Sequence, residues 1–270
     1  MSVVRGGTRG SVEVEQVAWR QSNGMSEAQR LHFDDVNANL QQYMHHPFLA
    51  ANQIQQAASR FHFGVSRAIL EAASVPLAEA KVVVEALLLL AQGLSIHEDV
   101  NRVSDRRRQL TVLAGDYDSS RYYWLLARAG RLDVISRLSN AVCRINEAKV
   151  TLLQTSSLSV LPEHYMDLRE TVEGELLYAL ARHFLPENAG EVDRLRPVVR
   201  AYVANEDFYR GGEHPHFSAR QVFDWLSVAI AQFTGPVSFV LEPVASFVEE
   251  FFVPLRERFE SHTYLEGNRG

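Results

Sequence analysis

The amino-acid sequence predicts an all-α fold in a single domain, and three observations lead to this prediction. The 270 residues include only 15 glycines and 9 prolines, about 9% of the chain against a typical ~12%. Helix start and stop signals follow one another from Ser26 onward, with almost no strand signal between them. The segments that these signals bound average about twenty residues, well above the usual ~11–12. We therefore expect eight or nine long helices in residues 26–270, preceded by a flexible leader over residues 1–25.

In the first half of the chain, capping residues and prolines place the helix boundaries. Ser26 and Gln29 have the spacing of a capping box and open a helix that ends before Pro47. Pro76 is suited to the first turn of a long apolar helix, whose valines and leucines predict burial on most faces. Gly130 is a natural C-cap. The predicted helices cover residues 26–46, 52–73, 77–102 and 107–129.

In the second half, prolines and glycines bound or bend the helices. Pro186 stops the helix that begins at Pro162, and Pro197 delays or kinks the next one. Two adjacent glycines, Gly211 and Gly212, then break the chain. The last element contains two further prolines that bend it. The predicted helices cover residues 131–158, 162–184, 191–209, 216–233 and 237–258.

Composition excludes several classes of protein. The formal net charge is −6, and nucleic-acid binding needs a clustered basic surface, so we expect no nucleic-acid partner. The longest apolar run, Val82–Ala91, is far shorter than the ~20 residues of a membrane span. The single cysteine, Cys143, cannot build a disulfide framework, and we interpret it as a small core residue. The N-terminus lacks the apolar core of a signal peptide, so we expect a cytoplasmic protein.

The segment most informative for chemistry begins at the end of the long apolar helix. His97, Glu98 and Asp99 are followed by the arginine pair Arg107 and Arg108, and then by the run L-A-G-D that ends at Asp116. Carboxylates at positions i, i+1 and i+4 of a helix end can hold Mg²⁺ ions that bridge a diphosphate. Arginines nearby can bind a second diphosphate through charge-assisted hydrogen bonds.

The third acidic position of this pattern carries an arginine. Arg102 stands at i+4 from Glu98, so the two side chains are spaced to pair with each other instead of sharing a metal. A second candidate motif, Glu206-Asp207-Phe208-Tyr209-Arg210, again ends in arginine. Both motifs therefore read E-D-x-x-R, and we expect no metal to be bound by this chain.

The spacing of these motifs resembles that of trans-isoprenyl diphosphate synthases, whose pattern reads H-D-D-x-x-D, then R-R-G and later L-A-G-D. The resemblance implies a helical bundle of the isoprenoid-synthase type with a degenerate active-site cleft. The loop between the arginine pair and L-A-G-D is shorter here than in the synthases. The residues of the degenerate cleft are His97, Glu98, Asp99, Arg102, Asp116, Glu206, Asp207 and Arg210.

A more specific resemblance is to the small, non-catalytic subunit (component I) of heptaprenyl diphosphate synthases. It rests on the runs H-P-F-L-A from His46, L-T-V-L-A-G-D-Y from Leu110 and I-N-E-A-K from Ile145, and covers roughly residues 31–255. It implies an obligate catalytic partner that carries intact Asp-rich motifs and the Mg²⁺ ions. Together the two subunits would extend farnesyl diphosphate with isopentenyl diphosphate to the C35 chain of menaquinone. This chain alone would be inactive and would bind no cofactor.

Two other functions remain open from the residues. The chain could be a diverged stand-alone prenyltransferase or terpene synthase, or a helical scaffold with no role in isoprenoid metabolism. The residues that the first alternative would use are Glu98, Asp99, Asp105 and Asp116.

The aromatic residues after the L-A-G-D run are candidates for the partner interface. Tyr117, Tyr122, Tyr123 and Trp124 are too many for one helix face to bury, and aromatic side chains are enriched in interface cores. A metal site at His214 and His216 is disfavoured, because no third ligand is visible beside them.

Overall fold

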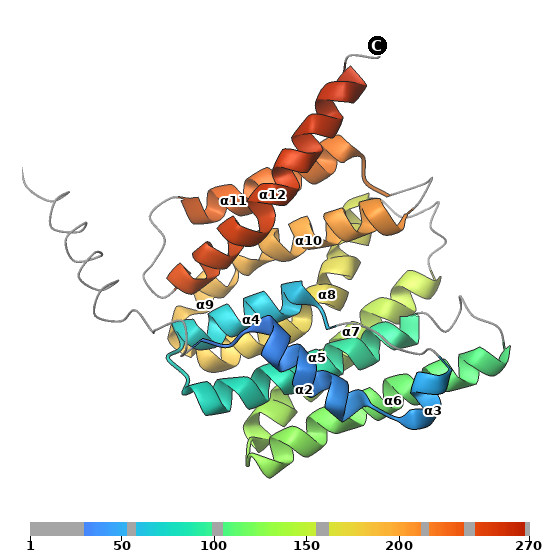
Figure 1. The fold of residues 1–270 in the computed structure, drawn as a ribbon. Coiled ribbons are helices and arrows are strands. Elements are labelled where there is room, and N and C mark those ends of the chain that lie inside the picture. The colour runs from blue at the N-terminus through green and yellow to red at the C-terminus, as the bar shows by residue number, and fades with distance from the viewer. Residues whose placement is uncertain are drawn as a thin grey trace, which may run out of the picture.

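The computed structural model describes residues 30–52, 58–98, 105–154, 162–211, 216–234 and 241–267, so the predicted leader lies outside the described residues. Every regular element in these ranges is helical, which confirms the all-α prediction. The helices are α2 (Phe33–Met44), α3 (Pro47–Ala51), α4 (Arg60–Ala72), α5 (Leu77–Glu98), α6 (Asp105–Arg128), α7 (Leu132–Gln154), α8 (Pro162–Phe184), the 3-10 helix Pro186–Asn188, α9 (Ala189–Val192), α10 (Leu195–Arg210), α11 (Ala219–Thr234) and α12 (Glu242–Gly267). Figure 1 shows long helices stacked in layers, with α11 and α12 at one end of the bundle and α6 near the other.

Boundaries set by proline and glycine agree with the sequence prediction. Helix α8 has the predicted bounds, and α10 begins only at Leu195, with Pro197 in its first turn. Gly130 adopts a φ of 71°, which a residue with a side chain rarely adopts, and it follows the end of α6 as predicted.

The prediction that a helix begins at Asn52 is wrong. The Asn52 side chain instead closes the short helix α3, where its Nδ2 donates to the Phe48 carbonyl oxygen at 2.7 Å. Helix α4 begins at Arg60, after Ser59, whose hydroxyl accepts the backbone N–H of His62 at 3.2 Å. Asparagine and serine are both favoured N-caps, so local sequence alone does not decide between the two positions.

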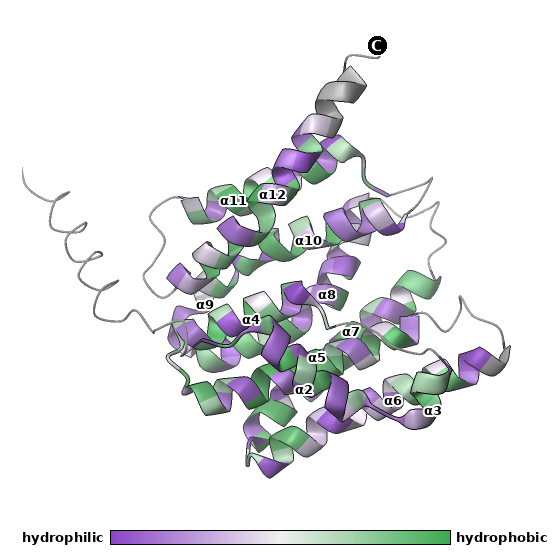
Figure 2. Cartoon of the chain, viewed as in Figure 1, coloured by the Kyte–Doolittle hydropathy of each residue, from purple (hydrophilic) through white to green (hydrophobic). Residues whose placement is uncertain are grey.

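Helix α5 lies at the centre of the bundle and is buried along most of its length, as the sequence predicts. Leu87 and Leu90 are almost fully buried, in a hydrophobic cluster that contains residues from α2 to α12. A Cβ atom on Gly93 would lie 2.8 Å from the carbonyl oxygen of Gly115, so these two glycines allow α5 and α6 to cross at close range. By contrast, Figure 2 shows both hydrophobic and hydrophilic residues on each of the outer helices α2, α6 and α12.

The apolar run over residues 82–91 therefore belongs to a core helix. Among the helices in the described part of the chain, none combines the length and the low charge that crossing a bilayer requires.

One carboxylate lies inside this core and joins α2 to α5. Glu85 is buried and accepts hydrogen bonds from Asn39 Nδ2 at 2.8 Å and from the Tyr43 hydroxyl at 3.4 Å, both on α2. Burial raises the pKa of Glu85, and the bond from Asn39 opposes this shift. Because a buried carboxylate needs donors, separating α2 from α5 would leave this group unsatisfied.

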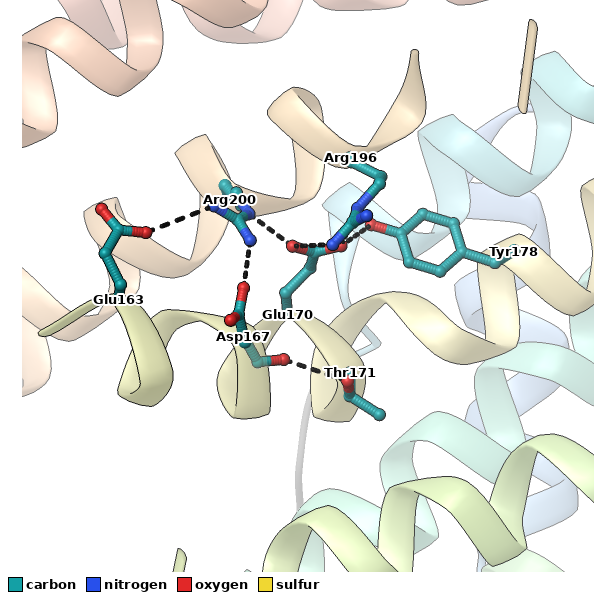
Figure 3. A network of polar contacts seen from close by, with 7 residues as sticks. All are labelled: Glu163, Asp167, Glu170, Thr171, Tyr178, Arg196 and Arg200. Atoms are coloured by element: carbon teal, nitrogen blue, oxygen red, sulfur yellow. Dashed lines mark hydrogen bonds and ion pairs between the residues drawn. The ribbon is translucent and has the colours of Figure 1, made fainter. Parts of the chain in front are cut away.

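A second buried carboxylate joins α8 to α10 (Figure 3). Glu170 on α8 is 4% exposed and accepts hydrogen bonds from Arg196 Nε at 2.7 Å and from the Tyr178 hydroxyl at 3.2 Å. Arg200 on α10 also donates to Glu170, and its guanidinium lies 5.3 Å from the ring centroid of Trp225 on α11. The other acidic partners of Arg200 are Asp167 and Glu163. The network fixes α8 and α10 relative to each other, and both helices carry residues of the candidate site.

The interpretation of Cys143 as a core residue is wrong, because its side chain is exposed. The buried positions of α7 include Leu138, Ala141 and Ile145. Cys143 lies two residues from the last two of these, and a helix turns by about 200° over two residues. The cysteine therefore lies on the opposite, outward face.

Candidate functional site

The two acidic motifs lie on helices that border the same cavity. Glu98 is the last residue of α5, and Glu206 and Arg210 lie in the last turns of α10. All three line a cavity of about 350 Å³. Asp99 and Arg102 lie outside the described residues. The structure thus brings together Glu98, Glu206 and Arg210, as the sequence predicts for the two halves of one cleft.

Glu98 is held by two cations from neighbouring helices. Lys149 Nζ on α7 lies 3.0 Å from one carboxylate oxygen, and Arg169 Nη1 on α8 lies 3.8 Å from the other. Lys149 also donates to the Leu94 carbonyl oxygen at 2.8 Å, which fixes its position against α5. The Glu98 carboxylate therefore joins three helices through ion pairs.

The Arg169 guanidinium interacts electrostatically with acids of both motifs. It donates to Glu173 at 2.9 Å, one turn along α8, in addition to its contact with Glu98. Burial disfavours its charge, but the carboxylates of Glu173, Glu98 and Asp207 outweigh this effect and raise the pKa of Arg169. A permanent cation of the chain thus stabilises negative charge from both motifs.

The acids of the second motif also have partners inside the chain. Arg210 Nη2 lies 3.1 Å from Glu206 Oε2, in an i, i+4 pair along α10. Asp207 accepts one hydrogen bond from the Tyr165 hydroxyl and one from the backbone N–H of His216, both at 2.8 Å. The Tyr165 and His216 rings stack, with centroids 4.0 Å apart. Asp207 therefore connects α8, α10 and the segment that precedes α11.

This arrangement does not fit a magnesium site. Mg²⁺ requires several oxygen ligands in near-octahedral geometry. Here both oxygens of Asp207 accept hydrogen bonds, and Glu98 and Glu206 are paired with cations. Over the ranges that the structure describes, no three His, Cys, Asp or Glu side chains are grouped so that they could hold a metal ion. What these groups can do chemically is neutralise one another.

Besides these charged residues, the cavity lining includes aromatic and aliphatic side chains. The Phe61 and Tyr202 rings stack with centroids 3.9 Å apart and an interplanar angle of 3°. Phe251, whose centroid is 6.0 Å from that of Phe61, also lines the cavity. Aliphatic side chains from α5 and α8 complete the wall, and they are Leu88, Ala91, Leu94, Val172 and Leu176.

Other residues predicted for the cleft lie apart from this cavity. His97 Nε2 is 3.3 Å from Asp116 Oδ1, so these two residues form a contact between α5 and α6. Asp105 begins α6, and Arg107 and Arg108 lie exposed in its first turn. His97, Asp116, Arg107 and Arg108 do not line the cavity.

The four aromatic interface candidates divide into two groups. Tyr122 is 1% exposed and belongs to the core, so it cannot contribute to a surface of this chain. Tyr117 is partly buried beside the small cluster of Leu49, and its ring lies 5.7 Å from that of His46. Tyr123 and Trp124 are 46% and 42% exposed. These last two lie on the outward face of α6.

Sequence reasoning did not identify Lys149, Arg169 and Tyr165 as residues of the site. Lys149 lies within the I-N-E-A-K run, but nothing in that run reveals its contact with Glu98. The i, i+4 spacing of Arg169 and Glu173 was a signal for an ion pair on α8. Their proximity to both motifs depends on how α8 packs, which no local pattern gives.

Comparison with known proteins identifies relatives of this chain. A family model described as heptaprenyl diphosphate synthase (HEPPP synthase) subunit 1 matches residues 46–204. The chain is 37% identical over 147 residues to heptaprenyl diphosphate synthase component 1 of Geobacillus stearothermophilus, an alignment that spans 53% of this chain and 66% of that relative.

Solved structures of prenyl synthases share the fold. A decaprenyl diphosphate synthase from Rhodobacter capsulatus superimposes with a TM-score of 0.57 at 15% identity, covering 87% of this chain and 99% of that one. The small subunit of geranyl diphosphate synthase from Antirrhinum majus superimposes with a TM-score of 0.51 at 13% identity, covering 90% and 100%. These likenesses confirm the predicted isoprenoid-synthase type of bundle. With a family match over more than half of its length, the chain belongs to the heptaprenyl diphosphate synthase subunit 1 family.

Proposed function

We propose that this chain is a non-catalytic subunit of a heteromeric, long-chain all-trans-prenyl diphosphate synthase. It stabilises a separate catalytic subunit that carries intact Asp-rich motifs and binds the Mg²⁺ ions. Together the two subunits extend farnesyl diphosphate with isopentenyl diphosphate to heptaprenyl diphosphate, for the side chain of menaquinone, in the cytoplasm. The chain binds no metal itself and makes no product alone.

The proposal rests on one observation, the pairing of acids from both motifs with cations of this chain: Glu98 pairs with Lys149 and Arg169, and Glu206 pairs with Arg210. A synthase needs free carboxylates at this point to hold Mg²⁺ against a diphosphate. In this chain arginine and lysine side chains neutralise those carboxylates, so the metal-dependent step falls to another subunit.

The names of the relatives support a divided enzyme. The relative from Geobacillus stearothermophilus is named as component 1 of its synthase, and the Antirrhinum majus protein is named as a small subunit. The alignment covers 66% of the length of the Geobacillus stearothermophilus relative. That the present chain is likewise a component of a synthase is therefore part of our proposal.

The outward face of the α6–α7 pair is the surface that we propose for the catalytic subunit. On α6 this face exposes Leu113 at 60% and Tyr123 at 46%, and on α7 it exposes Leu132 and Val150. The hydroxyl oxygens of Tyr123 and Ser139 lie 3.5 Å apart, which places the two helix faces side by side. Exposed aromatic and aliphatic side chains are typical of the core of an interface.

The test is reconstitution of activity. The purified full chain is assayed with farnesyl and isopentenyl diphosphates and Mg²⁺, alone and after addition of a synthase subunit from the same cell that carries both D-D-x-x-D motifs. We expect no product from this chain alone, and elongation by the mixture at least about tenfold faster than by the partner alone. As a control, a partner with its first aspartate changed to alanine gives no product in the mixture. Turnover by this chain alone would instead identify a stand-alone enzyme.

A further inference from the structure

We propose that the cavity between α4, α5, α8, α10 and α12 binds an uncharged apolar chain that ends in at most a hydroxyl group, and that it does not accept diphosphates. This binding site goes beyond the proposed function, because it depends only on residues of this chain. Three features of the described residues carry the inference: the size of the cavity, its aromatic wall and the internal pairing of its charged rim.

The size and the wall suit one short hydrocarbon chain. Ligand pockets in proteins measure about 300–1,000 Å³, and this cavity is about 350 Å³. The stacked rings of Phe61 and Tyr202 form part of the wall. Phe61 also contacts the rings of Phe247 and Phe252, with centroids 6.3 and 6.2 Å away, so its position is fixed from several sides. A wall that is held in this way keeps the space open instead of letting side chains fill it.

The rim contributes no net charge for an anionic head group. Its three acids each have a basic partner: Glu98 pairs with Lys149 at 3.0 Å, Glu173 with Arg169 at 2.9 Å, and Glu206 with Arg210 at 3.1 Å. Binding a diphosphate would require breaking these pairs and leaving carboxylates beside the phosphates, which is costly at a partly buried site.

One further cation of the rim lies at its outer edge. Arg60 is 3.8 Å from Asp34, and both side chains are largely exposed. Its charge is therefore screened by solvent.

Neutral polar groups complete the rim. Ser59, Gln92 and Ser95 lie in the lining near the charged residues. Serine and glutamine side chains can exchange hydrogen bonds with a hydroxyl group and carry no charge. The Ser59 hydroxyl already interacts with the backbone N–H and Nδ1 of His62. The ligand that fits these groups is thus an alcohol with an apolar tail. The tail can be a branched isoprenoid chain or a straight alkyl chain.

The experiment measures binding of four probes to the full chain by equilibrium dialysis or calorimetry. The probes are farnesol, 1-dodecanol, and farnesyl diphosphate with and without Mg²⁺. We expect saturable binding of farnesol, and affinity for farnesyl diphosphate at least about tenfold lower, with no gain from Mg²⁺. Equal binding of 1-dodecanol identifies a general apolar chain, and weaker binding identifies an isoprenoid one; both support the site. Failure to bind either alcohol, or tighter binding of farnesyl diphosphate, overturns the proposal.

Three variants localise the site. Ala91→Phe places a ring in the cavity and should abolish farnesol binding, whereas Ala231→Phe adds the same ring on the exposed surface of α11 and should not. Glu206→Gln keeps the shape of the side chain but frees Arg210 from its acidic partner. It should raise affinity for farnesyl diphosphate several-fold relative to the natural chain. Because Glu206→Gln predicts a gain, it tests the charge argument even if Ala91→Phe does not fold; no gain would contradict that argument.

The outcome is separable from the proposed function. Farnesol binding without activation of a catalytic partner would refute the proposed function alone. Activation without farnesol binding would refute only the cavity proposal.

Discussion

The chemistry available to each carboxylate depends on the groups that its fold places around it. Glu98 faces two cations, Asp207 accepts two hydrogen bonds, and Asp118 on α6 is 4% exposed. Asp118 lines a small pocket that also contains His46 and Gln92. Burial raises its pKa to about 7, and the charge of Arg121 opposes this shift. Burial therefore leaves Asp118, which belongs to neither acidic motif, partly protonated near neutral pH.

The raised pKa of Asp118 predicts a specific dependence of stability on pH. Between its ordinary pKa of 3.8 and its value of about 7 in the folded chain, the folded state keeps a proton that the unfolded state has lost. The free energy of unfolding should therefore fall as pH rises across this range and then level off. Asp118→Asn lacks this contribution, so its stability relative to the natural chain should increase from about pH 4 to about pH 7.

Urea unfolding at several pH values measures this difference. Asp224→Asn is the control, because Asp224 lies on α11 with its side chain 54% exposed and pairs only with Arg220, one turn away. The control should show little change across the same range. A constant difference between Asp118→Asn and the natural chain would contradict the prediction.

At the scale of the elements, sequence patterns predicted where most helices begin and end but not which side of each helix faces inward. Pro162 begins α8 because its ring fixes φ, and Gly130 follows the end of α6 because glycine tolerates a positive φ. Local sequence is sufficient to predict both boundaries. Whether Tyr122 or Tyr123 is buried depends on where α7 packs against α6. The same is true of Cys143, which is exposed although Ala141 and Ile145, two residues before and after it on α7, are buried. The sequence predicted two motifs that face one cleft. It did not predict the two cations that pair with Glu98, because they come from α7 and α8, whose packing the motifs do not encode.

The exposed face of α6 and α7 predicts where a mutation weakens assembly. Leu113→Asp combined with Tyr123→Ala removes two exposed apolar anchors from α6, and we expect affinity for the catalytic partner to fall at least about tenfold. Val228→Asp is the control, since Val228 is 46% exposed on α11, away from this face. Surface plasmon resonance gives the affinities, and circular dichroism checks that all variants remain folded. The interface would lie elsewhere if Val228→Asp lost as much affinity as the double variant, or if the double variant lost none.

At the scale of the whole molecule, the chain has the helical framework of prenyl synthases, and ion pairs join the helices around its cavity. The residues that neutralise the motifs also hold the bundle together: Glu98 joins α5 to α7 and α8, and Asp207 joins α10 to α8. The ion pairs and hydrogen bonds that engage these acids are therefore also contacts between helices. If the chain is the non-catalytic subunit that we propose, we expect that the arginines at the ends of the motifs are not the sole feature that prevents Mg²⁺ binding.

Restoring aspartate at both positions tests this argument. We expect Arg102→Asp combined with Arg210→Asp to produce no Mg²⁺-dependent elongation of farnesyl diphosphate by this chain alone. Glu98 would still be paired with Lys149 and Arg169, and Asp207 would still accept hydrogen bonds from Tyr165 and His216. Calorimetric titration with Mg²⁺ should likewise show no binding in the range of a working synthase. The matched control is the natural chain, assayed with and without its partner. If the double variant made product, the two arginines alone would account for the lost activity, and the ion pairs at Glu98 would have no inhibitory role.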